Sequence, residues 1–358
     1  IDTMSFLFDF GLNGSYTRYL TNDAESELRN VNMHHIAIGF PVTKWWKFSA
    51  GVGPYSNVGY NIVDNTQKSG IGLIDYYFEG NGGLNNFYLG TSVMLFDKLS
   101  IGVNYNYLFG FITNSRRIQF PNSSDMSVSE FEKTLNIRDN KFRIGLQYEH
   151  DFKNDYFITL GATYDHEASL SAKQSINYRN LFPGTSVSIN DSTVLLADYE
   201  ISSSEDEGEI IIPQNLGFGF STGLKERLIL TGEYNRQEWS KSLLLGKSDS
   251  LVNSNSMRLG IEVTPDPEAL RGYLKRVHYR LGGYYTNSYL RVRNEQIKDY
   301  GITFGVGLPI RGNKTTFNLG VVLGQRGTLN KDLVKENYSI INVTFTFHDI
   351  WFRKRVYE

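Results

Sequence analysis

The chain has 358 residues with 36 Lys and Arg against 38 Asp and Glu, and its net charge of −2 does not favour binding to nucleic acid. It has 23 Tyr, 23 Phe and 34 Gly but only 8 Pro, which is typical of strands and tight turns rather than helices. There is no cysteine, which excludes disulfides and thiol chemistry, and no apolar run approaches the ~18 residues of a membrane helix.

Large apolar side chains alternate with small or polar ones from the first residues onward, most clearly in residues 4–12, 99–109, 300–308 and 341–347. Successive side chains of a strand point to opposite faces, so each of these segments has one apolar and one polar face. The polar set is mostly Gly, Ser, Thr and Asn, whereas a soluble sandwich would use Lys, Glu and Arg on its outer face. This pattern predicts a barrel whose outer face meets lipid.

The alternation and the connectors predict strands near 4–20, 31–40, 47–62, 84–95, 99–111, 141–150, 156–172, 210–223, 228–244, 255–264, 276–290, 297–309, 314–328 and 336–348. Fourteen is an even number, as antiparallel closure with both termini at one end requires. The fold class is therefore all-β, a transmembrane antiparallel up-and-down β-barrel of about 14 strands, and residues 1–358 form a single domain.

The connectors alternate between short and long, which predicts short periplasmic turns and long extracellular loops in the bacterial outer membrane. The long ones include 63–83, 112–140 and 173–209, and the acidic run 202–209 in the last is expected to be solvated or, less often, to bind divalent cations. A C-terminal tail of about 349–358, with basic residues 353–355, is expected in the periplasm. Trp45, Trp46, Trp239 and Trp351 lie at expected interface levels, where lipid and lipopolysaccharide are the partners.

Local segments at 51–60, 213–220, 233–239, 258–262 and 279–285, together with the strand layout, resemble the FadL/TodX family of outer-membrane transporters for fatty acids and other hydrophobic compounds. The resemblance spans nearly the whole chain. It implies a plug inside the barrel and a kinked third strand that opens the wall sideways. The first predicted strand begins at about residue 4, so the sequence departs from the family at the plug, and plug-borne ligand contacts stay open.

The third predicted strand contains Pro54, which cannot donate a ladder hydrogen bond, with Gly51, Gly53 and Gly59 around it. These four residues are the candidates for a lateral opening through which substrate leaves. The alternative is a bulge that only shapes the barrel. Continuous backbone pairing on both sides of residues 51–59 would rule out the exit.

Several charged or polar residues are predicted to face the lumen: Asp9, Arg143, Gln147, Glu233, Arg258, Glu262 and Arg280. An arginine guanidinium could hold a carboxylate head group, which makes Arg143, Arg258, Glu262 and Arg280 the ligand candidates. The alternative is that these charges neutralise one another across the lumen, because an unpaired buried charge is costly.

We expect no catalytic centre, metal site or cofactor. None of the six His forms a His-Glu-x-x-His pattern, and His34 and His35 are strand neighbours whose rings should face opposite ways.

Two functions compete. The first is passive uptake of hydrophobic small molecules such as fatty acids, which predicts an apolar lumenal pocket and a wall opening near Pro54. The second is a structural or accessory subunit of an outer-membrane assembly or secretion complex, with other outer-membrane or periplasmic proteins as partners. A diffusion porin is a weaker alternative, because open aqueous channels typically use ~16–18 strands.

Overall fold

The computed structural model describes residues 5–122, 128–181, 186–189, 192–195, 198–248, 251–310 and 315–350. The predicted basic tail and Trp351 lie outside these residues. The helices within them are short 3-10 turns: η1 (Lys153–Asp155), η2 (Trp239–Lys241), η3 (Tyr273–Arg276) and η4 (Asn330–Asp332). None of the described helices has the length and apolar character to cross a membrane.

A closed ring of antiparallel strands forms the barrel: β1 (Ser5–Leu20), β2 (Glu25–Pro41), β3 (Trp46–Lys68), β4 (Gly72–Leu95), β5 (Leu99–Gln119), β6 (Val128–Asp151), β7 (Tyr156–Asp165), β12 (Asn215–Leu224), β13 (Leu228–Gln237), β16 (Ser254–Val263), β17 (His278–Val292), β18 (Glu295–Pro309), β19 (Thr316–Gly327) and β20 (Lys335–Ile350). β20 pairs with β1 along the whole of both strands and closes the ring. The predicted barrel of about 14 strands is confirmed.

The two faces of the wall follow the predicted alternation. Outward side chains such as Ile101, Phe218, Leu259 and Phe304 are 37–67% exposed, although each is large and apolar. A soluble protein would bury such residues, whereas lipid solvates them. The alternate residues face the lumen.

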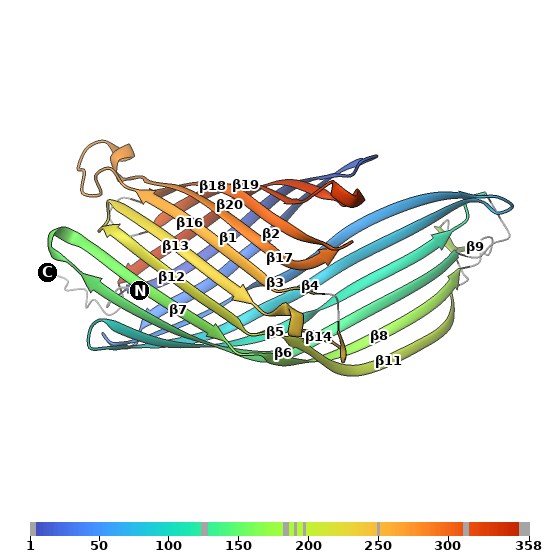
Figure 1. Cartoon of the computed structure of the whole chain (residues 1–358), viewed down its shortest axis with the longest axis horizontal. Helices are drawn as coiled ribbons and strands as arrows, with labels where there is room; N and C mark the ends of the chain where they lie inside the picture. Colours follow the sequence, from blue (N-terminus) through green and yellow to red (C-terminus); the bar gives the residue numbers. More distant parts are fainter. Residues whose placement is uncertain are drawn as a thin grey trace.

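The prediction of long loops is wrong for most of their described residues, which are strands. β8 (Ala168–Leu181) pairs with residues 128–137 of β6, whereas β7 pairs with residues 143–151 of the same strand. β11 (Asp198–Ile212) pairs in turn with β8. Six strands, β3 to β6, β8 and β11, therefore run on past the rest of the ring as a sheet that we call the extension (Figure 1).

Smaller pieces complete this end of the molecule. β9 (Ser186–Ile189) and β10 (Ser192–Leu195) form a hairpin, and β14 (Leu243–Leu244) pairs with both β11 and β15 (Lys247–Ser248). The predicted strand 156–172 bends between β7 and β8, and the predicted strand 210–223 bends at Pro213 between β11 and β12. The acidic run 202–209 belongs to β11, where Glu205 Oε2 lies 2.7 Å from Lys173 Nζ of β8.

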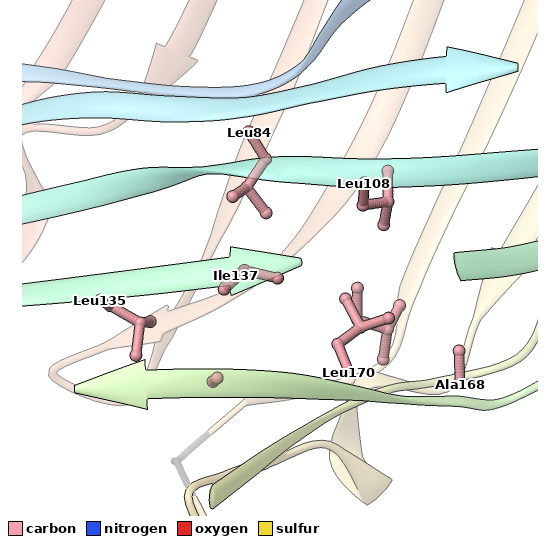
Figure 2. Close-up of a cluster of buried hydrophobic side chains, with 8 residues drawn as sticks. Leu84, Leu108, Leu135, Ile137, Ala168 and Leu170 are labelled. Carbon is pink, nitrogen blue, oxygen red and sulfur yellow. The ribbon is translucent and has the colours of Figure 1, made fainter. Parts of the chain in front are cut away.

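The base of the extension has an apolar core on its inner face. Its side chains come from β4, β5, β6, β8 and β11: Leu84, Leu108, Leu135, Ile137, Ala168, Leu170, Ala172 and Ile212. Figure 2 labels six of these residues on the neighbouring strands. Gly82 and Gly110 adopt φ of +101° and +147° beside this core, and a Cβ on either would overlap a backbone carbonyl oxygen of the neighbouring strand. The close approach of β4 and β5 at this level therefore requires glycine at both positions.

Truncation of this core should destabilise the extension. Leu170 is fully buried, so Leu170→Ala should lower the free energy of unfolding by about 2–5 kcal/mol, through lost apolar burial and the cavity left behind. The measurement is the urea midpoint of the barrel refolded in detergent. Leu281→Ala, on the outward face, is the matched control and should cost much less. Equal losses for the two variants would contradict a packed core at Leu170.

Candidate functional site: a split wall and a polar lumen

The wall of the barrel is interrupted between β2 and β3. Their pairing runs from Pro41 opposite Lys47 to Ile36 opposite Val52, and then stops. From this point toward the extension, which we call upward, β2 pairs only with β1, and β3 pairs only with β4 as far as Lys68. We call the space between residues 25–35 of β2 and residues 53–68 of β3 the split. Residues 51–59 of β3 are thus paired with β4 throughout, apart from one bulge, but their pairing with β2 is absent from Gly53 onward.

Of the four predicted opening residues, Gly51 lies just below the base of the split, opposite Ala37 of β2, and Gly53, Pro54 and Gly59 lie in the part of β3 that borders the split. Gly51 has the ring of Tyr88 over it, 2.6 Å from where a Cβ would stand. A Cβ on Gly53 would lie 2.9 Å from the carbonyl oxygen of His34, so the two strands approach closely just before they part. Pro54 comes just above the last β2–β3 pair, where its missing amide costs no bond to β2. Gly59 has open space around it.

A β-bulge in β2 lies at the same level. Gly11 pairs with His35 and Leu12 pairs with Met33, which leaves His34 as the extra residue. The prediction that the two His rings face opposite ways is therefore wrong, because the bulge breaks the alternation. The Nδ1 atoms of His34 and His35 lie 2.6 Å apart, and His35 Nε2 lies 2.7 Å from Asp9 Oδ2.

A second bulge, in β3, directs Tyr55 across the barrel. Tyr55 has no partner in the β3–β4 register, which shifts between Pro54 and Ser56. Its phenol interacts electrostatically with Arg143 of β6, Asp165 of β7 and Tyr289 of β17. β3 and β17 lie six strands apart by the shorter way around the ring, so this side chain reaches into the interior.

The lumenal charges are paired. Asp165, with 3% of its side chain exposed, accepts hydrogen bonds from Arg143 Nε at 2.5 Å and Arg143 Nη2 at 2.9 Å. Lys141 Nζ, also buried, lies 3.4 Å from Asp165 Oδ2. Arg258 pairs with Glu233 at 3.2 Å, and Arg280 Nε donates to Glu262 Oε2 at 2.6 Å. All three predicted arginines therefore have carboxylate partners, as the neutralising alternative expects.

Arg280 belongs to a longer chain of polar contacts that we call the lumenal belt. Arg280 Nη1 donates to Asn318 Oδ1 at 2.8 Å, Asn318 Nδ2 donates to Thr346 Oγ1 at 3.4 Å, and Thr346 Oγ1 donates to Asp9 Oδ1 at 2.8 Å. Through His278, Glu262 and His35 the belt extends from β16 to β2. Arg280 reaches β19 because β18, between them, presents Gly305 and Gly307.

The inward side chains that line the cavities of the lumen include many polar and charged groups. A cavity of about 800 Å³ lies along β7, β12, β13, β16 and β17, and its inward lining includes Thr163, Thr231, Glu233, Arg258 and Arg280. Two more, of about 470 and 480 Å³, share Arg143 and Thr163.

By contrast, an apolar cavity of about 760 Å³ is lined by outward residues such as Leu146, Leu160, Phe218, Phe220 and Leu259. Its position over outward side chains places it on the outer face of the wall, so this cavity does not provide the predicted apolar pocket in the lumen.

Sequence reasoning missed Asp165, Lys141 and Tyr55. Alternation could have identified Asp165, since Thr159, Gly161 and Thr163 precede it on the inward face. Tyr55 had no such signal, because its direction depends on a bulge.

Within the described ranges, no group of three or more His, Asp or Glu is arranged to hold a metal ion.

Removal of the Asp165 charge should leave the buried Lys141 and the half-exposed Arg143 without a carboxylate partner. Asp165→Asn should therefore destabilise the barrel by about 3–5 kcal/mol, because an unpaired buried charge is costly. Glu233→Gln removes a half-exposed partner of Arg258 and should cost under about 1 kcal/mol. Urea titration followed by heat-modified gel mobility measures both. Equal effects would show that Asp165 does not neutralise the arginine and lysine beside it.

Comparison with known proteins agrees with this geometry. No curated protein sequence matches the chain. The toluene transporter TodX of P. putida shares the fold at a TM-score of 0.61 and 13% identity, over 98% of this chain and 91% of TodX. A Pseudomonas aeruginosa FadL homologue gives 0.62 and 12% identity over 97% and 90%, and the Ralstonia pickettii toluene transporter TbuX gives 0.59 and 12% over 97% and 90%. The resemblance to FadL/TodX is thus confirmed for the fold. The family model that matches is BamG, over residues 2–358, and the chain belongs to the BamG family.

Proposed function

We propose that this chain is a bacterial outer-membrane barrel that delivers hydrophobic small molecules, such as fatty acids, sideways into the membrane through the split between β2 and β3. The observation that carries the proposal is the loss of β2–β3 pairing above Ile36 and Val52. An uninterrupted wall offers no sideways route, whereas here the wall is open over residues 53–68 of β3. The barrels of similar fold include transporters of toluene.

The route proposed here does not cross the lower lumen. A hydrophobic molecule is poorly solvated by the ion pairs at Arg143, Arg258 and Arg280, and apolar ligands prefer apolar walls. The extension stands above these groups, and the part of β3 that borders the split carries the exposed apolar side chains of Tyr60, Ile62 and Val63. We infer entry at the extension and exit through the split, with Tyr55 beside the exit and the polar lumen closing the way to the periplasm.

An engineered disulfide across the base of the split, which we call the staple, tests this route. A Cβ on Gly53 lies 3.5 Å from His35 Cβ, within the span of a disulfide, and the chain has no other cysteine. In a Gram-negative host without its own fatty-acid barrel, the His35→Cys/Gly53→Cys variant should take up radiolabelled oleate when reduced and lose that uptake when oxidised, because β3 can no longer move away from β2.

The matched control is Ile38→Cys/Ala50→Cys, which joins residues already opposite each other in the paired part of the strands. Its uptake should not depend on oxidation. Uptake no higher than that of cells with an empty vector, or uptake unaffected by the His35–Gly53 staple, would overturn the proposal.

A second candidate is a non-transporting accessory subunit of an outer-membrane assembly or secretion complex. The polar lining of the lumenal cavities and the free edge of β3 favour it. Residues 53–68 include exposed Tyr60, Ile62 and Val63, with Asp64 and Lys68 as their only charged residues. An unpaired edge with few charges can accept a strand from another protein. The edge of β11, in contrast, carries Glu205, Asp206, Glu207 and Glu209, which oppose such pairing.

A charge on the β3 edge separates this candidate from the first. Ile62→Lys should abolish stoichiometric co-purification of envelope proteins after gentle detergent extraction, as measured by quantitative mass spectrometry, because a lysine blunts strand pairing. Glu207→Lys on β11 is the control and should leave the complex intact. Recovery of the barrel alone from native membranes would contradict the accessory role.

A further inference from the structure

The connector between β16 and β17, residues 264–277, has an unusual surface for a turn at the short-connector end. It stands out from the end of the barrel as a knob (Figure 1). Leu270 is 98% exposed and Leu274 is 70% exposed, and Tyr273 lies between them on the surface. Exposure of two leucines to water in one short segment is unfavourable, so an apolar medium should cover them.

The knob is held in a defined conformation. The backbone amide of Asp266 donates to the carbonyl oxygen of Lys275 at 2.8 Å, and Gly272 allows the tight turn with φ of +84°. Thr264 and Val277 are buried at its two ends. Leu270 and Leu274 are therefore presented by an ordered segment rather than by a chain free to turn them inward.

The knob leans over the outward face of the wall. The hydroxyl of Tyr279, an outward residue, donates to the carbonyl oxygen of Leu274 at 3.1 Å, and the hydroxyl of Tyr273 donates to that of Pro309 at 3.2 Å. The same end of the barrel carries other exposed apolar side chains in its connectors: Trp45, Phe96, Phe152 and Ile310. Such a girdle marks the level at which the hydrocarbon meets the head groups.

Basic side chains surround the two leucines. Arg271 and Lys275 are exposed, and the guanidinium of Arg276 lies 5.5 Å from the ring centre of Tyr273. The Nε atom of Arg276 is buried without a hydrogen-bond partner. Against these three cations the connector has only Asp266 and Glu268 as acids. Leucine together with arginine and lysine is the pairing that binds a phospholipid surface, through acyl chains and phosphates respectively.

We propose that residues 264–277 are a membrane-surface contact, in which Leu270 and Leu274 enter the acyl boundary of the adjacent leaflet and Arg271, Lys275 and Arg276 meet phospholipid phosphates. The occupant is the bilayer itself. The contact orients the barrel about its axis, because it lies at one position on the ring, between β16 and β17.

The cysteine-free chain permits a site-specific test. Leu270→Cys is labelled with an environment-sensitive fluorophore and placed in nanodiscs of phosphatidylcholine and phosphatidylglycerol. A spin-labelled lipid should quench the label as strongly as it quenches one at Phe304→Cys on the lipid-facing wall. Iodide in the water should quench it far less than a label at Asp23→Cys in the β1–β2 turn.

Arg271→Gln/Lys275→Gln should weaken the lipid quenching at position 270 in discs with phosphatidylglycerol and change it little in pure phosphatidylcholine. A label at position 270 that iodide reaches as it reaches position 23 would overturn the proposal. Shielding in native membranes but not in nanodiscs would also overturn it, and would assign the knob to a protein partner. Neither result depends on oleate uptake, so this contact and the proposed function fail separately.

Discussion

A backbone amide that faces lipid must find its hydrogen-bond partner within the protein, since the hydrocarbon offers none. Strands meet this demand only as a closed ring, and the pairing of β20 with β1 along both entire strands completes it here. The alternation of side chains follows from the same constraint, because each strand then has one face toward lipid and one toward the lumen. Within the ring, the upper part of the β2–β3 boundary departs from the rule. The amides there need water, a head group, a cargo molecule or another strand.

The paired charges of the lumen limit which molecules the barrel can bind there. Its arginines are matched with carboxylates, and Asp165 neutralises two cations at once in a buried position. Groups committed to one another in this way are poor receptors for a free carboxylate, because a ligand would first have to displace a well-placed partner. The apolar surfaces lie elsewhere, along the part of β3 that borders the split and on the outside of the wall. Any hydrophobic cargo therefore has its path near the rim rather than along the axis.

The sequence predicts the ring well because lipid imposes a strict period of two on strands such as β5, β18 and β20. It fails above the membrane, where water meets both faces and no apolar alternation is required. Residues 202–209 illustrate this, because their charges are typical of a loop although backbone bonds to β8 hold them as a strand. At the site, Gly51, Gly53 and Pro54 were visible as residues unsuited to a central strand, and alternation could have identified Asp165. The direction of Tyr55 and the contact of His34 with His35 depend on bulges, which shift register by one residue and have no compositional signal here.

The lumenal belt has a consequence for how the barrel closes. It passes from β20 to β1 through the bond between Thr346 and Asp9, and this is the place where the first and last strands of the ring meet. The junction of β20 with β1 is thus held by backbone hydrogen bonds in the wall and by a side-chain hydrogen bond in the lumen. The contacts of Arg280 and Asn318 lie within β16–β20, whereas the bond from Thr346 to Asp9 cannot form until β20 has docked on β1. The two sets of bonds therefore form together, and a nascent barrel in which β20 has not yet reached β1 lacks both of them.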